Sequence, residues 1–123
     1  MYKFLHTRVR VSDLDRSIDW YCDNLGFKVF RRVKHIAHLE LPGNEHTFEL
    51  KSTPDYDLNV QEDLMHICIA VPDLTTLCDE LEKKGIEVWP DDWREKFANS
   101  KRKMAFITDP DNYEVELVEM QQK

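Results

Sequence analysis

The feature that most constrains the fold is an internal repeat. Residues 6–14 (HTRVRVSDL) recur sixty positions later as residues 66–74 (HICIAVPDL), with His, Val, Asp and Leu at matching places. Such a repeat indicates two copies of one supersecondary unit, and a unit of about 60 residues buries too little surface to be very stable alone. The sequence therefore predicts two similar modules that pack against each other or against a partner chain.

Each repeat continues into an amphipathic helix. Asp13 and Asp73 stand where helix N-caps belong, and Gly26 and Gly85 stand where the helices end. Between these signals the apolar residues follow helical spacing and predict one buried stripe per helix. The first stripe is Leu14, Ile18, Tyr21, Cys22 and Leu25, and the second is Leu74, Leu77, Cys78 and Leu81.

A short apolar strand and a hairpin are expected after each helix. The strands are residues 27–30 and 86–89, and the hairpins pair 36–41 with 46–51 and 104–108 with 113–120. The predicted fold class is α+β, with the order β-α-β-β-β twice. We expect modules at residues 1–53 and 65–123 within one compact domain, joined by a polar, acidic linker at 54–64.

Four residues with metal-binding side chains occupy matched positions in the two modules. Strand side chains alternate between faces, so His6 and His66 point away from the apolar side of their strands. Glu49 lies between Phe48 and Leu50, and Glu116 lies between Val115 and Leu117, so both carboxylates also point away from the apolar side. Two imidazoles and two carboxylates without a thiolate predict a site for one borderline divalent metal.

The remaining histidines and the cysteines have simpler interpretations. His35, His38 and His46 have no counterpart in the repeat, and we expect them on the surface, as we do Glu114 and Glu119. Cys22, Cys68 and Cys78 share no motif spacing, which favours buried small hydrophobes in a reducing compartment.

Charge and hydropathy exclude several partners. The formal net charge is −7, which argues against bulk electrostatic binding to nucleic acid or to an anionic membrane. No apolar run reaches the roughly 18–20 residues that span a bilayer, and residues 1–6 do not have the pattern of a signal peptide. We expect a cytoplasmic protein with a small-molecule substrate.

The whole pattern resembles a known family. Residues 6–28, 66–71 and 106–117 are similar to bacterial glyoxalase I (lactoylglutathione lyase), a member of the vicinal oxygen chelate superfamily. The resemblance implies cupped mixed sheets with a helix on each convex face. It implies that His6, Glu49, His66 and Glu116 are the metal ligands, with Ni²⁺ or Co²⁺ as the metal and Zn²⁺ as the alternative. It also implies a homodimer in which paired modules of different chains share each site.

The resemblance further implies a reaction. Methylglyoxal and glutathione form a hemithioacetal, which is isomerised to S-lactoylglutathione through an enediolate whose charge the metal stabilises. Glu116 is the expected catalytic base and Glu49 its partner on the opposite face. Arg10 occupies the position of an arginine that pairs with a substrate carboxylate, and Lys101 and Lys103 are candidates for contact with an anionic substrate.

Alternatives remain open at the level of substrate. Thr53 stands where glyoxalase I normally has asparagine, and residues 93–103 contain no glycine where the family has a glycine-containing loop. Another thiol, or another metal-dependent enzyme of the superfamily such as an epimerase or a thiol transferase, is compatible with these residues. A metal-free small-molecule binding protein is the third interpretation.

Overall fold

The computed structural model describes residues 1–56 and 65–120, and the chain divides into two compact units, Met1–Leu58 and Asn59–Lys123. Each unit contains one mixed sheet and one long helix, so the α+β fold class predicted from the repeat is confirmed. Most of the predicted linker, residues 57–64, lies outside the described residues.

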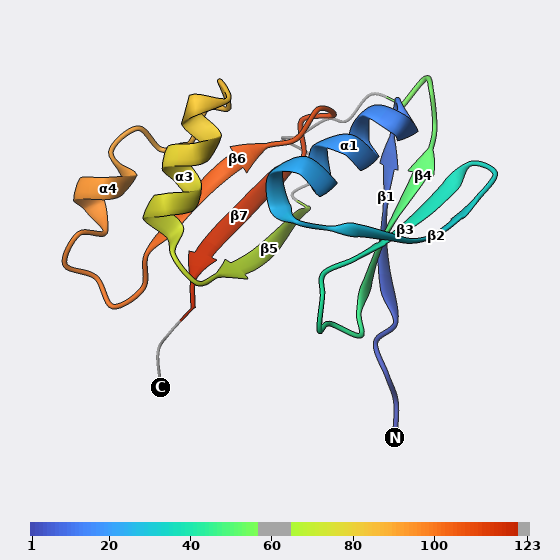
Figure 1. The fold of residues 1–123 in the computed structure, drawn as a ribbon, viewed down its shortest axis with the longest axis horizontal. Helices are drawn as coiled ribbons and strands as arrows, with labels where there is room; N and C mark the ends of the chain where they lie inside the picture. The colour runs from blue at the N-terminus through green and yellow to red at the C-terminus, as the bar shows by residue number, and fades with distance from the viewer. Residues whose placement is uncertain (57–64, 121–123) are drawn as a thin grey trace. The chain divides into compact units, whose positions relative to one another are not determined.

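The first unit has the complete β-α-β-β-β order (Figure 1). Its sheet has the strand order β1-β4-β3-β2, in which β1 and β4 are parallel and the other neighbours are antiparallel. The parallel pair at one edge follows from the helical crossover, since parallel neighbours need a long connection. The elements are β1 (His6–Val11), α1 (Leu14–Leu25), β2 (Lys28–Val33), β3 (Ile36–Glu40) and β4 (Thr47–Ser52).

Helix α1 begins and ends at the predicted signals. The Asp13 carboxylate accepts a hydrogen bond from the backbone N–H of Arg16 at 3.1 Å, and Gly26 adopts the left-handed conformation at φ 75°. The helix lies against β4, β3 and β2. Its fully buried Tyr21 packs edge-on against Phe27 and Phe48, with ring centroids 5.7 and 5.1 Å away. This aromatic cluster anchors β4 to the helix.

The second unit repeats the plan with one strand fewer. Its sheet has the order β5-β7-β6, again with a parallel edge pair, β5 and β7. The Asp73 carboxylate caps α3, which lies against β7, and Gly85 follows the helix at φ 84°. The elements are β5 (His66–Val71), α3 (Leu74–Lys83), α4 (Trp93–Lys96), β6 (Met104–Thr108) and β7 (Glu114–Glu119).

The predicted strand at residues 86–89 is wrong. Only Trp89 pairs with the sheet, through an isolated bridge to Phe106 with two backbone hydrogen bonds of 2.8 Å. Pro90 follows directly and has no N–H with which to continue a ladder. The chain instead forms the short helix α4, whose Trp93 is buried.

The two faces of the edge strands differ as their alternation predicts. In β1, Val9 and Val11 are buried, whereas His6, Arg8 and Arg10 are exposed. In β5, Ile69 is buried, whereas His66, Cys68 and Ala70 are exposed. Each predicted histidine ligand therefore lies on the face of its strand that is turned away from the core.

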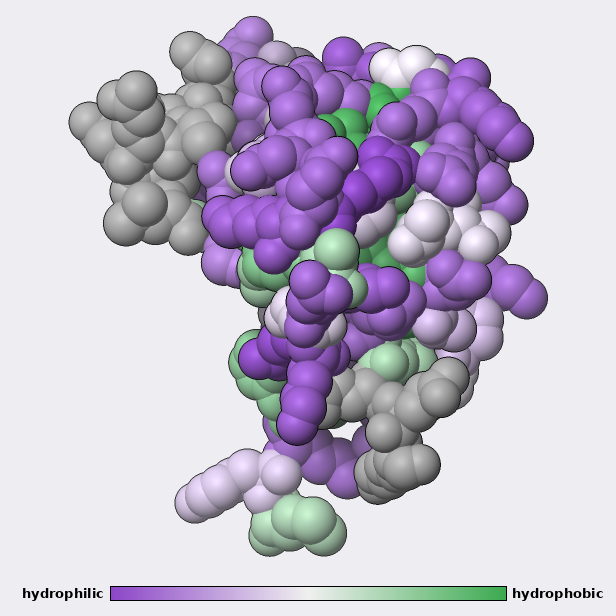
Figure 2. Space-filling model, turned by 90° about the vertical axis from the view of Figure 1, so that its left-hand side faces the viewer, coloured by the Kyte–Doolittle hydropathy of each residue, from purple (hydrophilic) through white to green (hydrophobic). Residues whose placement is uncertain are grey.

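The surface agrees with the high content of charged residues. Figure 2 shows a face that is mostly hydrophilic, with smaller apolar areas. In the described part of the chain, no helix combines the length and the hydropathy that a membrane span requires.

Candidate metal centre

The first half of the candidate site is built on β1 and β4. Glu49 lies at the middle of β4 and is only 2% exposed, although it points to the face opposite the buried Phe48 and Leu50. The parallel register places β1 alongside, and His6 Nε2 lies 3.4 Å from Glu49 Oε2. The structure therefore brings together two of the four predicted ligands.

Two further basic side chains contact the same carboxylate. Arg8, directly opposite Glu49 in the register, donates a hydrogen bond from Nε to Glu49 Oε1. His38 on β3 is also opposite Glu49, and its Nδ1 lies 3.5 Å from Oε2. His38 is half-buried, so its expected surface position is wrong. Strand alternation already places Arg8 on the same face as His6, but only the register between β3 and β4 shows that His38 reaches Glu49.

The second half of the candidate site is built on β5 and β7. His66 Nε2 lies 3.2 Å from Glu116 Oε1, so the other two predicted ligands are also adjacent. The Cys68 thiol, opposite Glu116 in the register, donates a hydrogen bond to Oε2 at 3.4 Å. The Glu116 side chain is 18% exposed, which is more than the 3% of the Glu49 side chain.

The cysteines do not share one environment. Cys78 is buried, as expected, and its burial raises the pKa of the thiol to about 12. Cys68 is exposed, which corrects the interpretation of all three as buried hydrophobes. Partial desolvation, together with the hydrogen bond and the negative charge of Glu116, raises the pKa of Cys68 to about 11. The thiolate is therefore a minor species at neutral pH.

The donor atoms fit a divalent metal. Two ligands that each lie about 2.1 Å from one ion are about 3.0–3.4 Å apart in octahedral or tetrahedral coordination. The imidazole-to-carboxylate separations of 3.4 and 3.2 Å are close to that spacing. Among residues 1–56 and 65–120, no three His, Cys, Asp or Glu side chains form a group that could hold a metal ion. Each unit thus brings together one imidazole and one carboxylate of the predicted set.

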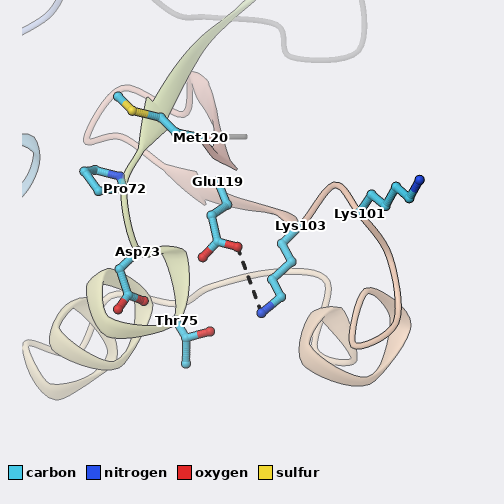
Figure 3. Close-up of a pocket in the computed structure, with 7 residues that line it drawn as sticks. All are labelled: Pro72, Asp73, Thr75, Lys101, Lys103, Glu119 and Met120. Atoms are coloured by element: carbon cyan, nitrogen blue, oxygen red, sulfur yellow. Dashed lines mark ion pairs between the residues drawn. The ribbon is translucent and has the colours of Figure 1, made fainter. Parts of the chain in front are cut away.

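The predicted substrate contacts lie in two places. Arg10 is exposed on β1, on the same strand face as His6. Lys101 and Lys103 line a cavity of about 600 Å³ beside the start of α3, together with Asp73 and Glu119 (Figure 3). Lys103 Nζ lies 4.0 Å from Glu119 Oε2, whereas Lys101 extends away from that pair.

The orientation of Glu119 separates this cavity from the face that carries Glu116. Side chains three residues apart on a strand point to opposite faces, and Glu119 accepts a hydrogen bond from the backbone N–H of Leu74 in α3. The structure therefore does not bring Lys103 together with the candidate ligands of its unit. The role of both lysines in substrate binding stays a prediction.

The contact between Cys68 and Glu116 predicts a change in thiol reactivity. Replacing Glu116 by Gln removes a negative charge that raises the pKa of Cys68, so more thiolate forms at pH 8. We expect metal-free Glu116→Gln protein to be alkylated by iodoacetamide at Cys68 faster than the wild type, as measured by peptide mass spectrometry. Cys78 is the internal control and reacts in neither protein until it is unfolded. Equal rates at Cys68 would contradict this geometry.

Comparison with known proteins identifies the family. Residues 3–117 match the model of the Glyoxalase/Bleomycin resistance protein/Dioxygenase superfamily. The chain is 30% identical to a probable lactoylglutathione lyase of Synechocystis over 97% of its own length and 96% of that protein. It is 31% identical to the lactoylglutathione lyase of Haemophilus influenzae, covering 95% of this chain and 92% of the relative.

A solved structure supports the same assignment. The trypanothione-dependent glyoxalase I of Leishmania major is 32% identical and superimposes with a TM-score of 0.77, covering 97% of this chain and 87% of that one. Its likeness extends over both units of the chain. The chain therefore belongs to the Glyoxalase/Bleomycin resistance protein/Dioxygenase superfamily and, within it, to the lyases of the glyoxalase I (lactoylglutathione lyase) family.

Proposed function

We propose that this lyase isomerises the hemithioacetal of methylglyoxal and a thiol, with glutathione as the first candidate, to the thioester of lactate. The supporting observation is the pair of His–Glu contacts, His6 with Glu49 and His66 with Glu116, at equivalent places of the repeat. A pair of this kind on each unit is what a shared two-nitrogen, two-oxygen metal site requires. The reaction is the detoxification of a reactive aldehyde.

The proposed chemistry is an isomerisation and needs no oxidant or reductant: one proton moves from carbon to the neighbouring carbon, and the hydroxyl proton moves from one oxygen to the adjacent oxygen. A carboxylate removes the proton from the carbon that bears sulfur, and the proton is returned to the neighbouring carbon, which was the ketone carbon. We assign the removal and the return to Glu116, with Glu49 on the opposite side of the substrate. A divalent metal, when bound, would supply positive charge that stabilises the negative charge developing on the substrate oxygens.

His6, Glu49, His66 and Glu116 are the proposed metal ligands. Imidazole and carboxylate donors suit Ni²⁺, Co²⁺ or Zn²⁺, and we place Ni²⁺ or Co²⁺ first because of the resemblance to short bacterial members. Arg8 and His38 contact Glu49 without being part of the proposed set. In metalloproteins such contacts orient the ligating carboxylate.

The thiol is the least constrained part of the proposal. Arg10 is assigned to a carboxylate of the thiol, because its guanidinium can bind a carboxylate through two hydrogen bonds. Thr53 and the glycine-free stretch at 93–103 distinguish this chain from the glutathione-dependent pattern. The trypanothione dependence of the Leishmania relative supports a comparison of several thiols.

We further propose a homodimer in which each site combines a first unit and a second unit from different chains. The support is that each unit supplies only one imidazole and one carboxylate to the proposed set. We place the enzyme in the cytoplasm, since its three free cysteines suit a reducing compartment.

The first test is metal-dependent turnover. Protein reconstituted with Ni²⁺, Co²⁺ or Zn²⁺ should convert methylglyoxal and glutathione to a thioester, followed by its ultraviolet absorbance. Glu116→Gln should lower kcat by about 10²–10⁴-fold, the usual contribution of a positioned acid or base, while metal analysis still finds the ion. Glu114→Gln, two residues earlier on β7, is the control and should retain activity. Absence of turnover with all three metals and all tested thiols would refute the proposed reaction.

The second test addresses the thiol. The same assay with glutathione and with trypanothione, both with methylglyoxal, should show which thiol gives the larger kcat/KM. Arg10→Met should raise KM for the preferred thiol more than it lowers kcat, because Arg10 is assigned to the thiol and not to the reacting carbons. The double variant Lys101→Ala/Lys103→Ala tests the lysines in the same way. An unchanged KM would remove the affected residue from the substrate site.

The third test addresses the sharing of sites. His6→Ala and Glu116→Gln each inactivate a different unit, so a dimer of one variant of each kind has one intact site only if sites combine units of different chains. Random mixing after reversible dissociation should then restore about a quarter of the wild-type activity, since half of the dimers are mixed and each has one intact site out of two. No recovery in dimers shown to be mixed by native mass spectrometry would place each site within one chain.

A further inference from the structure

The two carboxylates of the proposed site are held in different ways. Glu49 is 2% exposed, and Arg8 donates a hydrogen bond to its Oε1 while His38 lies 3.5 Å from its Oε2. Glu116 is more exposed, and its contact at Oε2 is the thiol of Cys68 at 3.4 Å. An arginine–carboxylate hydrogen bond is charge-assisted and strong, whereas a thiol is a weak donor.

The difference arises at equivalent places of the repeat. Arg8 is opposite Glu49 in the parallel ladder of β1 and β4, as Cys68 is opposite Glu116 in the ladder of β5 and β7. In the antiparallel ladders, His38 is opposite Glu49 and Phe106 is opposite Glu116. The backbone thus offers the same two neighbouring positions to each carboxylate. In the first unit both positions have basic side chains. In the second unit they have a thiol and a phenyl ring.

The hydrogen bond of Arg8 selects one oxygen of Glu49. Oε1 is occupied by the guanidinium, and Oε2 is the oxygen that lies 3.4 Å from His6 Nε2. A carboxylate anchored in this way presents a single oxygen beside the imidazole and has little freedom to rotate. Glu116 has its two oxygens divided between His66 and Cys68, and among residues 1–56 and 65–120 no guanidinium hydrogen-bonds to it.

We propose that Arg8 is a positioning residue that holds Glu49 with Oε2 toward His6. This inference rests on the proposed metal site. In the alternative role, Arg8 lowers metal affinity because it occupies the Glu49 carboxylate. The two roles predict opposite effects of removing Arg8 on metal affinity.

The decisive measurement is metal affinity in Arg8→Met, whose side chain is long, unbranched and uncharged. If Arg8 positions the ligand, Co²⁺ affinity measured by competition with a chelator should fall about 10–100-fold, the usual cost of losing a residue that orients a metal ligand. The visible spectrum of bound Co²⁺ should also change. Arg8→Lys keeps the charge but loses the planar donor and should recover only part of the affinity.

Arg10→Met is the matched control. Arg10 lies two residues further along the same face of β1, so its removal changes the net charge equally and should leave Co²⁺ affinity and spectrum unchanged. Unchanged Co²⁺ affinity in folded Arg8→Met would overturn the inference. Tighter Co²⁺ binding would also overturn it and would favour the competing role. Failure of the wild type to bind Co²⁺ would instead refute the proposed metal site, so the two failures are distinguishable.

Discussion

The burial of the Glu49 carboxylate is the constraint on which the first unit of the structure depends. Phe48 and Leu50 are buried on one face of β4, and Glu49 between them is 2% exposed on the other face. A carboxylate at such a place is costly unless basic groups or hydrogen-bond donors satisfy it. Those groups come from the strands on either side, Arg8 and His6 from β1 and His38 from β3.

The contacts of Glu49 depend on the order of the strands in the sheet. β1 and β4 become neighbours only because α1, β2 and β3 form the connection between them, and the parallel register then sets Arg8 opposite Glu49. The second unit reproduces the parallel edge pair although residues 86–89 contribute only a bridge. The geometry of the His–Glu pair therefore depends on the edge pair and not on a complete fourth strand.

The sequence predicted the parts of the structure that local periodicity determines. Alternation in β1 and β5 placed His6 and His66 on the outer face, and Asp13 and Gly26 marked the ends of α1. Alternation also placed Cys68 on the exposed face, where the general tendency of cysteine to be buried gave the wrong answer. The contact of His38 with Glu49 depends on the register between β3 and β4. The residue pattern of one strand does not determine that register. The apolar run at 86–89 predicted a strand, whereas in the structure only Trp89 pairs, directly before Pro90.

The two units have a similar spacing between imidazole and carboxylate but different residues around the carboxylate. The imidazole-to-carboxylate separations are 3.4 Å in one unit and 3.2 Å in the other, although Glu49 is buried among basic groups and Glu116 is partly exposed beside a thiol. Burial alone would not require this similarity, because an exposed carboxylate is satisfied by water. The matched spacing in two different surroundings supports the proposal that both pairs are metal ligands. The differences between the surroundings fall on the neighbouring positions, where Arg8 and His38 stand beside Glu49, and Cys68 and Phe106 stand beside Glu116, so the two carboxylates have different contacts.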